Sequence, residues 1–155
     1  MRTFSKVYGL AGLRVGYMFG PEKLVEAVNK VAIPFSINTL AQIAALTSLD
    51  AQEELTARIA EVRAQRVAVT EAINAATGRE TVLPNSQANF IWIDEGRIAD
   101  LSLLDDVSVA TTTDLGDFLA QRNILIRCFA GEGARITITT EEETSQLLAA
   151  LGIER

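Results

Sequence analysis

The sequence contains no histidine and only one cysteine among its 155 residues. Histidine-based catalytic triads are therefore excluded. We also predict no bound metal, because zinc sites are built mainly from cysteine and histidine ligands. Cys128 has no second cysteine with which to form an internal disulfide, a composition that favours a reducing, cytoplasmic location. We expect its thiol to be chemically inert.

Long apolar runs and clusters of basic residues are also missing. No apolar stretch reaches the roughly 18 residues that cross a bilayer. The first residues lack the charged segment and apolar core of a signal peptide. The formal net charge is −6, which makes nucleic acids and anionic membranes poor partners. We therefore expect neither a nucleic acid nor a membrane among the partners of this protein.

The densest motif lies in residues 3–17, where Lys6 stands between the hydroxyls of Thr3 and Ser5 and the guanidinium of Arg14. Hydroxyls and an arginine together can hold a phosphate, because a guanidinium presents a fixed fork of donors to phosphate oxygens. A lysine in apolar surroundings loses basicity, and its neutral amine can then attack a carbonyl. Lysine chemistry beside a phosphate site is what a pyridoxal phosphate (PLP) enzyme needs. The alternative interpretation is a glycine-rich surface loop with a solvated lysine.

This stretch closely resembles the cofactor-lysine motif of class I/II aminotransferases, in the fold-type-I PLP family. The motif has S/T-x-S-K, an arginine eight residues after the lysine, and Gly-Tyr or Gly-Phe just beyond, all of which are present here. The resemblance implies that Lys6 holds PLP as the internal aldimine and later shuttles the proton. It also implies that Arg14, with Ser5 and Thr3, binds the cofactor phosphate.

A second set of candidate residues lies near the C-terminus, where Arg127 and Arg135 occupy neighbouring predicted strands around a glycine-containing loop. Strand alternation puts Ile136 and Ile138 on the face opposite Arg135, whose guanidinium can bind a carboxylate bidentately. Ile-x-x-Arg, a glycine loop and Arg-Ile-Thr-Ile resemble the aminotransferase C-terminal motif, which implies that Arg135 grips the substrate α-carboxylate. The resemblance also places Arg127 near the distal group of the substrate and Phe35 in the substrate pocket. The alternatives are solvated rim arginines and plain packing of the phenylalanine.

Apolar spacing predicts helices that alternate with strands, an α/β arrangement. The expected helices cover residues 22–32, a segment opening at 39, and residues 50–77, 114–122 and 140–151. The expected strands cover residues 14–19, 80–83, 89–93, 124–127 and 135–139. Residues 94–113 are expected to form a loop with one helical turn. Thr39, Asp50, Asp114 and Thr140 are predicted to cap the starts of their helices, and Gly78 to follow the end of the longest one.

The resemblance implies that the chain is the C-terminal part of a fold-type-I PLP-dependent transferase, because complete members are more than twice as long. Residues 1–76 would end the large PLP-binding domain and include the long interdomain helix, and residues 77–155 would form the small α+β C-terminal domain. In the resembled family, the aromatic residue stacked on the pyridine ring and the aspartate paired to its nitrogen precede the cofactor lysine. A second subunit completes the site, so we expect a homodimer and an isolated chain without activity.

The leading hypothesis is a PLP-dependent aminotransferase that moves an amino group between an aromatic amino acid or histidinol phosphate and a 2-oxo acid such as 2-oxoglutarate. The short loop between the two arginines is more like that of the aromatic-type members. A related PLP-dependent decarboxylase or acyltransferase stays open, although acyltransferases of this fold usually carry Gly-Gly soon after the lysine. A non-enzymatic role also stays open, as the ligand-sensing domain of a transcription regulator or as an inactive fragment.

Overall fold

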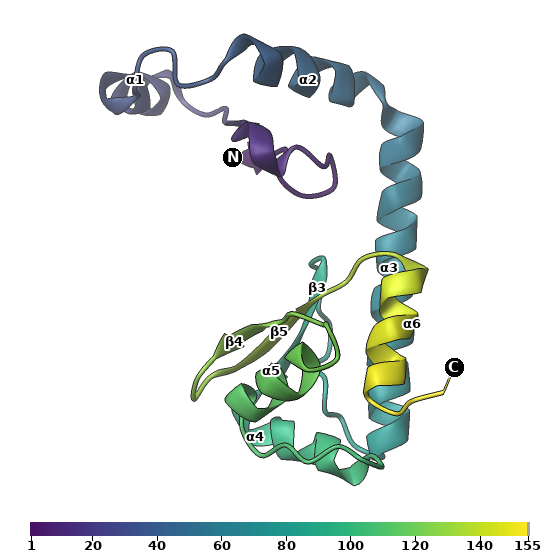
Figure 1. Cartoon of the computed structure of the whole chain (residues 1–155). Coiled ribbons are helices and arrows are strands. Elements are labelled where there is room, and N and C mark those ends of the chain that lie inside the picture. Colours follow the sequence, from purple (N-terminus) through teal and green to yellow (C-terminus); the bar gives the residue numbers. More distant parts are fainter. Residues whose placement is uncertain (155) are drawn as a thin grey trace. The chain divides into compact units, whose positions relative to one another are not determined.

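The computed structural model describes residues 1–154, which fold into two compact units (Figure 1). The first unit runs from Met1 to Ile59 and the second begins at Ala60. No helix within the described residues is both long enough and apolar enough to span a membrane. The compact units divide inside the long helix of residues 52–77. A division into compact units is not a test of domain boundaries, so the boundary expected after residue 76 stays a prediction.

The first unit is built from short strands and helices around a small apolar cluster. Its elements are β1 (Arg2–Thr3), the 3-10 helix η1 (Ala11–Leu13), β2 (Gly16–Tyr17), α1 (Glu22–Val31), α2 (Thr39–Asp50) and the start of α3 (Gln52–Thr77). We call residues 2–17, from β1 to β2, the lysine hairpin. Phe4 and Val15 of this hairpin pack with Ala41 and Ala45 of α2. Because alanine side chains are small, α2 can lie close to the hairpin.

The strand predicted for residues 14–19 is much shorter in the structure, where only Gly16–Tyr17 is extended and paired. Arg14 ends η1 with a left-handed backbone conformation, φ 53°, so the strand cannot begin at this residue. Within the described residues β2 has β1 as its single partner, and nothing pairs with its other edge. The predicted helix over residues 22–32 is confirmed by α1.

The cap of α2 is Asn38 rather than the predicted Thr39. The side-chain oxygen of Asn38 accepts a hydrogen bond from the Ala41 backbone N–H at 2.8 Å. Asparagine suits this position because its short side chain satisfies one of the unpaired N–H groups of the first turn. Asp50 is likewise the last residue of α2 and does not cap α3.

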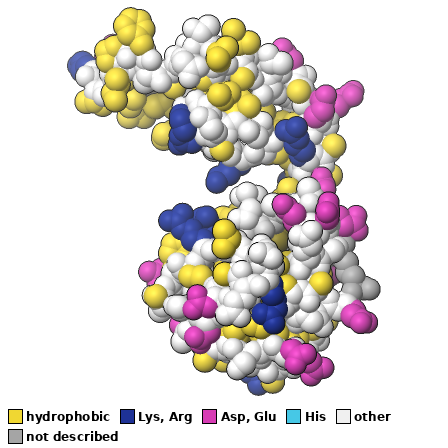
Figure 2. Space-filling view, in the orientation of Figure 1, with side chains coloured by type: hydrophobic (Ala, Val, Ile, Leu, Met, Phe, Trp, Pro, Cys, Tyr) yellow, Lys and Arg dark blue, Asp and Glu magenta, His cyan; other side chains and the backbone are white. Residues whose placement is uncertain are grey.

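Helices α1 and α2 leave much apolar surface uncovered within their unit. The large apolar side chains exposed in residues 1–50 include Phe19, Leu24, Val28, Val31, Ile33, Phe35, Leu40, Ile43 and Leu46. Figure 2 shows apolar side chains gathered over the part of the chain that holds α1 and α2. The apolar faces predicted from sequence are therefore present, but nothing in this unit covers them.

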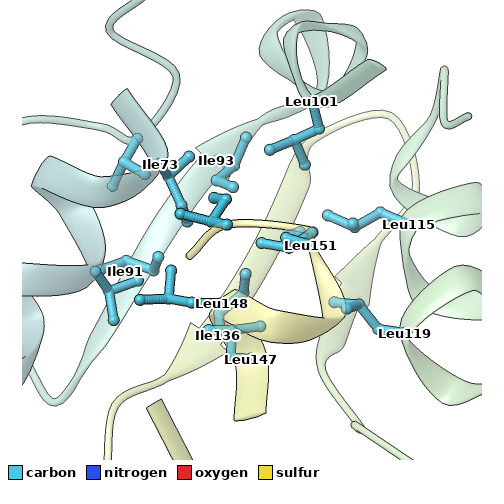
Figure 3. Packing of buried hydrophobic residues seen from close by; sticks show 14 of the residues in the cluster. Ile73, Ile91, Ile93, Leu101, Leu115, Leu119, Ile136, Leu147, Leu148 and Leu151 are labelled. Atoms are coloured by element: carbon cyan, nitrogen blue, oxygen red, sulfur yellow. The ribbon is translucent and has the colours of Figure 1, made fainter. Parts of the chain in front are cut away.

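The second unit is an antiparallel sheet of three strands with helices packed on one face. Its elements after α3 are β3 (Phe90–Asp94), α4 (Glu95–Ile98), the 3-10 helix η2 (Ala99–Leu103), α5 (Thr112–Ala120), β4 (Arg127–Phe129), β5 (Gly133–Thr137) and α6 (Glu141–Ala150). The strand order is β3-β5-β4, so β5 is central. Ile91 and Ile93 of β3 and Ile136 of β5 join the helices in the core (Figure 3).

The C-terminal half of α3 forms one wall of this core through Val69 and Ile73, neither of which is exposed. Helix α6 adds Leu147 and Leu148 to the same core. The end of α3 is as predicted: Gly78 follows it with φ 65°, a left-handed conformation that suits glycine. Burial of one apolar stripe therefore holds this half of the helix in the second unit.

Several predicted boundaries in the second unit are wrong. Residues 80–83 form no strand, although the Leu83 backbone N–H donates to the Trp92 carbonyl at 2.8 Å. Thr111, not Asp114, caps α5, while Asp114 closes a capping box from the third helical position. The segment expected to be loop with one helical turn holds both α4 and η2.

The two strands that carry the arginines are also shifted from their predicted positions. Strand β4 covers Arg127–Phe129 instead of residues 124–127, and β5 covers Gly133–Thr137 instead of residues 135–139. Ile124 and Ile126 pack against the core from outside the ladder. Their apolar character reflects burial alone, which does not require strand pairing.

Gly133 is expected to tolerate no side chain. A Cβ at this position would lie 2.4 Å from the Ile93 carbonyl oxygen and 2.7 Å from the Trp92 ring. We predict that Gly133→Ala lowers the free energy of unfolding by about 1–3 kcal/mol, the usual cost of overpacking. Gly96→Ala is the matched control, because Gly96 lies in α4 with open space around it. Thermal unfolding measures both, and equal stabilities would contradict the prediction.

Candidate functional site

The lysine hairpin brings together the residues predicted to bind the cofactor phosphate. The Phe4 backbone N–H donates to the Val15 carbonyl at 3.2 Å, so the segment with Thr3 and Ser5 runs beside the segment with Arg14. Within the first segment, the Ser5 backbone N–H donates to the Thr3 hydroxyl oxygen at 3.1 Å. Two hydroxyls and a guanidinium thus belong to one small structure.

Lys6 lies in the turn between β1 and η1, where its carbonyl accepts a hydrogen bond from the Gly9 N–H at 2.8 Å. Gly9 has φ 73°, which suits a residue without a Cβ. The Lys6 side chain is exposed, so the predicted apolar surroundings are not present in this chain. Next to it, Arg58 of α3 donates from Nη1 to the Val7 carbonyl at 3.4 Å.

Arg14 is held at the end of η1 by its own side chain. Its Nη1 donates to the Ala11 carbonyl at 2.7 Å. A guanidinium has five N–H donors, so this bond orients the group without using its full capacity. Two residues later, a Cβ on Gly16 would lie 2.7 Å from the Arg2 carbonyl oxygen. Only glycine therefore lets the two strands of the hairpin come this close.

Arg127 and Arg135 lie on neighbouring paired strands, as predicted, and the register puts them directly opposite each other. On the other side of β5, Arg135 is paired with Trp92 of β3. Strand alternation therefore puts Trp92 and both arginines in one row on the sheet face away from the apolar core. The buried Ile136 and Ile138 occupy the other face, which confirms the predicted alternation. We call this outer surface the arginine face.

Aromatic rings hold the two guanidinium groups in place. Arg135 Cζ lies 5.3 Å from the centroid of the Phe90 ring, and Arg127 Cζ lies 5.1 Å from that of Phe129. Arg135 Nε is buried and has no hydrogen-bond partner within residues 1–154. A buried donor without a partner is costly, so this group is suited to a ligand with acceptor oxygens. Phe90 was not among the predicted site residues, although its place at the start of a strong strand is a usable signal.

Phe35 and Cys128 are the remaining residues singled out from the sequence. Phe35 is fully exposed and has φ 59°, so its place in a substrate pocket stays a prediction. Cys128 lies in β4, between Arg127 and Phe129, and is exposed. Desolvation, followed by the charges of Asp117 and Glu95, raises the pKa of its thiol. A raised pKa leaves less thiolate, as expected for an unreactive cysteine.

No group of three or more His, Cys, Asp or Glu side chains in residues 1–154 is arranged to hold a metal ion. The chemical groups of the lysine hairpin are instead those that PLP requires: an amine for its aldehyde, and hydroxyl and guanidinium donors for its phosphate. The residues present therefore fit this cofactor.

Comparison with known proteins decides the family. The family model described as aminotransferase class I and II matches residues 1–151, nearly the whole chain. The chain belongs to the class I and II aminotransferases. Among members of this family, an aromatic amino acid aminotransferase from Corynebacterium jeikeium is 46% identical over 153 residues. That match covers 97% of this chain and 38% of the relative, so the chain spans well under half the length of the class I and II aminotransferase it resembles.

Solved aminotransferase structures share the fold. A Burkholderia pseudomallei protein assigned as an aminotransferase matches with TM-score 0.73 and 32% identity, covering 96% of this chain and 42% of that one. The histidinol-phosphate aminotransferase from Clostridium acetobutylicum matches with TM-score 0.76 and 21% identity over the same shares of the two chains. The chain therefore has the α/β fold of part of a fold-type-I aminotransferase, as predicted.

Proposed function

We propose that the full-length protein containing this chain is a PLP-dependent aminotransferase. It would transfer the amino group of an aromatic amino acid to a 2-oxo acid such as 2-oxoglutarate. The observation that carries the proposal is the placement of Lys6, two hydroxyls and Arg14 on one hairpin. The aromatic substrate rests on the 46% identity to a relative that bears this name. We further propose that the protein is cytoplasmic, in keeping with the single cysteine, and that it forms a homodimer, as the family resemblance implies.

Each residue has a distinct task in this proposal. Bound PLP supplies an electron sink that weakens the bonds to the α-carbon of an amino acid. Lys6 would hold the cofactor covalently through Nζ and then carry the proton that leaves the α-carbon. Arg14, with Thr3 and Ser5, would fix the phosphate. Arg135 would hold the substrate α-carboxylate through two parallel hydrogen bonds, the geometry that guanidinium and carboxylate share.

A direct assay tests the proposal. The full-length protein is mixed with PLP, 2-oxoglutarate and phenylalanine or tyrosine, and glutamate formation is followed. A parallel reaction uses histidinol phosphate, since Arg127 beside Arg135 offers a second cation for an anionic distal group. We expect the aromatic amino acids to react faster. Absence of glutamate in every reaction would refute the aminotransferase assignment.

Arg14→Ala in the full-length protein is expected to weaken PLP binding about 10- to 150-fold. The reason is the loss of a charge-assisted hydrogen bond, worth about 1.5–3 kcal/mol. Arg2→Ala is the matched control, because Arg2 is an exposed arginine on the same hairpin. Equilibrium dialysis of PLP measures both variants. Wild-type affinity in Arg14→Ala would show that the phosphate is held elsewhere.

Arg135→Lys keeps the positive charge but loses the two-pronged geometry of the guanidinium. We expect kcat/KM for the aromatic amino acid to fall about 10- to 150-fold by the same range of bond energies, with PLP still bound at the wild-type level. Steady-state kinetics and the absorbance of bound PLP measure the two properties. Unchanged kinetics would remove Arg135 from the substrate site.

A further inference from the structure

Arg66, in the second half of α3, is the only charged side chain among the buried residues of the described chain. It is 9% exposed and forms no ion pair with any described residue. A buried charge is unfavourable unless it is hydrogen-bonded. The bond that the structure gives it runs from Nη1 to the Ala88 carbonyl oxygen, at 2.7 Å.

Ala88 lies in the connector that leads from residue 83 to β3. The next residue, Asn89, accepts a hydrogen bond from the Ile138 N–H at 2.9 Å through its carbonyl. Phe90 then begins β3, and its carbonyl accepts a bond from the Ser86 hydroxyl at 2.8 Å. The Phe90 ring is the one that lies beside the guanidinium of Arg135. Arg66 therefore anchors the chain two residues before the aromatic partner of Arg135.

Packing alone does not hold this connector. A cavity of about 230 Å³ lies between α3 and the connector, with Arg66 and Val67 on the helix side and Leu83, Ser86 and Gln87 on the other. Because this space is not filled by side chains, the connector could move into it. The Val82 N–H, just before the connector, donates to Asn74 Oδ1 of α3 at 2.9 Å. At the other end of the connector, the hydrogen bond from Arg66 to Ala88 opposes such a shift.

We propose that Arg66 is a positioning residue for Arg135. By fixing the Ala88 carbonyl, it keeps Phe90 where the ring orients the guanidinium of Arg135 toward a carboxylate. The inference rests on the proposed role of Arg135 in binding the substrate α-carboxylate. Arg66 itself is not among the residues proposed to bind substrate or cofactor.

The test measures binding of 3-phenylpropionate, an aromatic monocarboxylate without an amine, to the full-length holoenzyme by calorimetry. Arg66→Met removes the donor and keeps an apolar stem. We expect its dissociation constant to rise about tenfold, equivalent to about 1.4 kcal/mol, with PLP content unchanged. Arg66→Lys keeps a cationic donor and should recover most of the affinity. Arg63→Met, an exposed arginine on the same helix, should match wild type.

A second measurement separates positioning from general destabilisation. Amide hydrogen exchange in residues 83–92 should be faster in Arg66→Met than in wild type, while the α6 amides keep their protection. Arg66→Leu, which also lacks a donor, replaces Arg66→Met if that variant does not fold.

The variant Arg135→Met distinguishes a failure of the positioning role of Arg66 from a failure of the carboxylate site at Arg135. If it loses 3-phenylpropionate binding while Arg66→Met binds as wild type does, the positioning role is wrong. If Arg135→Met itself binds normally, the proposed carboxylate site is wrong.

Discussion

Replacing Lys6 with alanine in the full-length protein is expected to lower the transamination rate by about 10²–10⁴-fold, the range that a positioned acid–base group supplies. No other lysine lies on the lysine hairpin, so no second amine on this hairpin could take over the proton transfer. Lys23→Ala is the matched control, since Lys23 is an exposed lysine on α1. Single-turnover kinetics with phenylalanine and 2-oxoglutarate provide the measurement.

The covalent bond itself can be located chemically. Borohydride reduction of the PLP-loaded protein, followed by peptide mapping, should place the label on the peptide that contains Lys6. Label on Lys23 or Lys30 instead would contradict the assignment, even if Lys6→Ala were inactive for another reason.

The second large effect concerns the 155-residue chain on its own, which we expect not to transaminate. It covers only 38% of the length of its Corynebacterium jeikeium relative. Lys6, the proposed cofactor lysine, is exposed in this chain, whereas a neutral, reactive amine requires shielding from water. The assay mixes purified chain with PLP, phenylalanine and 2-oxoglutarate and follows glutamate. Turnover at about 1–10³ s⁻¹, the usual range for enzymes, would overturn the expectation.

The same isolated chain should associate with itself through residues 1–50. Apolar side chains on α1 and α2 are exposed there, and one edge of β2 pairs with no strand of the described chain. Patches of this kind favour association in water. Light scattering coupled to gel filtration measures the mass, and Leu40→Ser with Leu46→Ser should reduce it. Thr47→Ser on the same helix is the control. A monomeric wild-type chain would contradict this expectation.

Helices with a complete apolar stripe could be predicted from sequence, and so could the strong strand at residues 89–93, which matches β3 to within one residue. The bounds of the other strands could not. The long helix that ends before Gly78 was predicted nearly to the residue, because both its stripe and its terminal glycine are local signals. Residues 80–83 have strand-like composition but form a single backbone bond to β3, which depends on the tertiary structure. Two helix caps lie one and three residues before their predicted positions. Asn38 is followed by Thr39, and Thr111 by Asp114, and residues of all these types are good helix caps.

The candidate site shows a similar division. The register that puts Arg127 opposite Arg135 follows from a short loop between two strands, so sequence could indicate it. The exposure of Lys6 could not be inferred from sequence, because the neighbouring apolar residues Phe4 and Val15 direct their side chains into their own cluster and not toward Lys6. Arg66 carried no sequence signal, since a lone arginine in a polar stretch of helix is usually solvated. Its importance appears only when the carbonyl that it binds is known.

The facing arginines of β4 and β5 have a consequence for how stability is measured. Like charges directly opposite each other on paired strands are unfavourable, and the aromatic rings offset only part of this repulsion. An anion that binds both guanidinium groups binds the folded state alone, so it adds stability that grows with its concentration. The melting temperature of the second unit should therefore depend on whether the buffer contains chloride, phosphate or a dicarboxylate. Variants of this protein are comparable only when the buffer anion and its concentration are held constant.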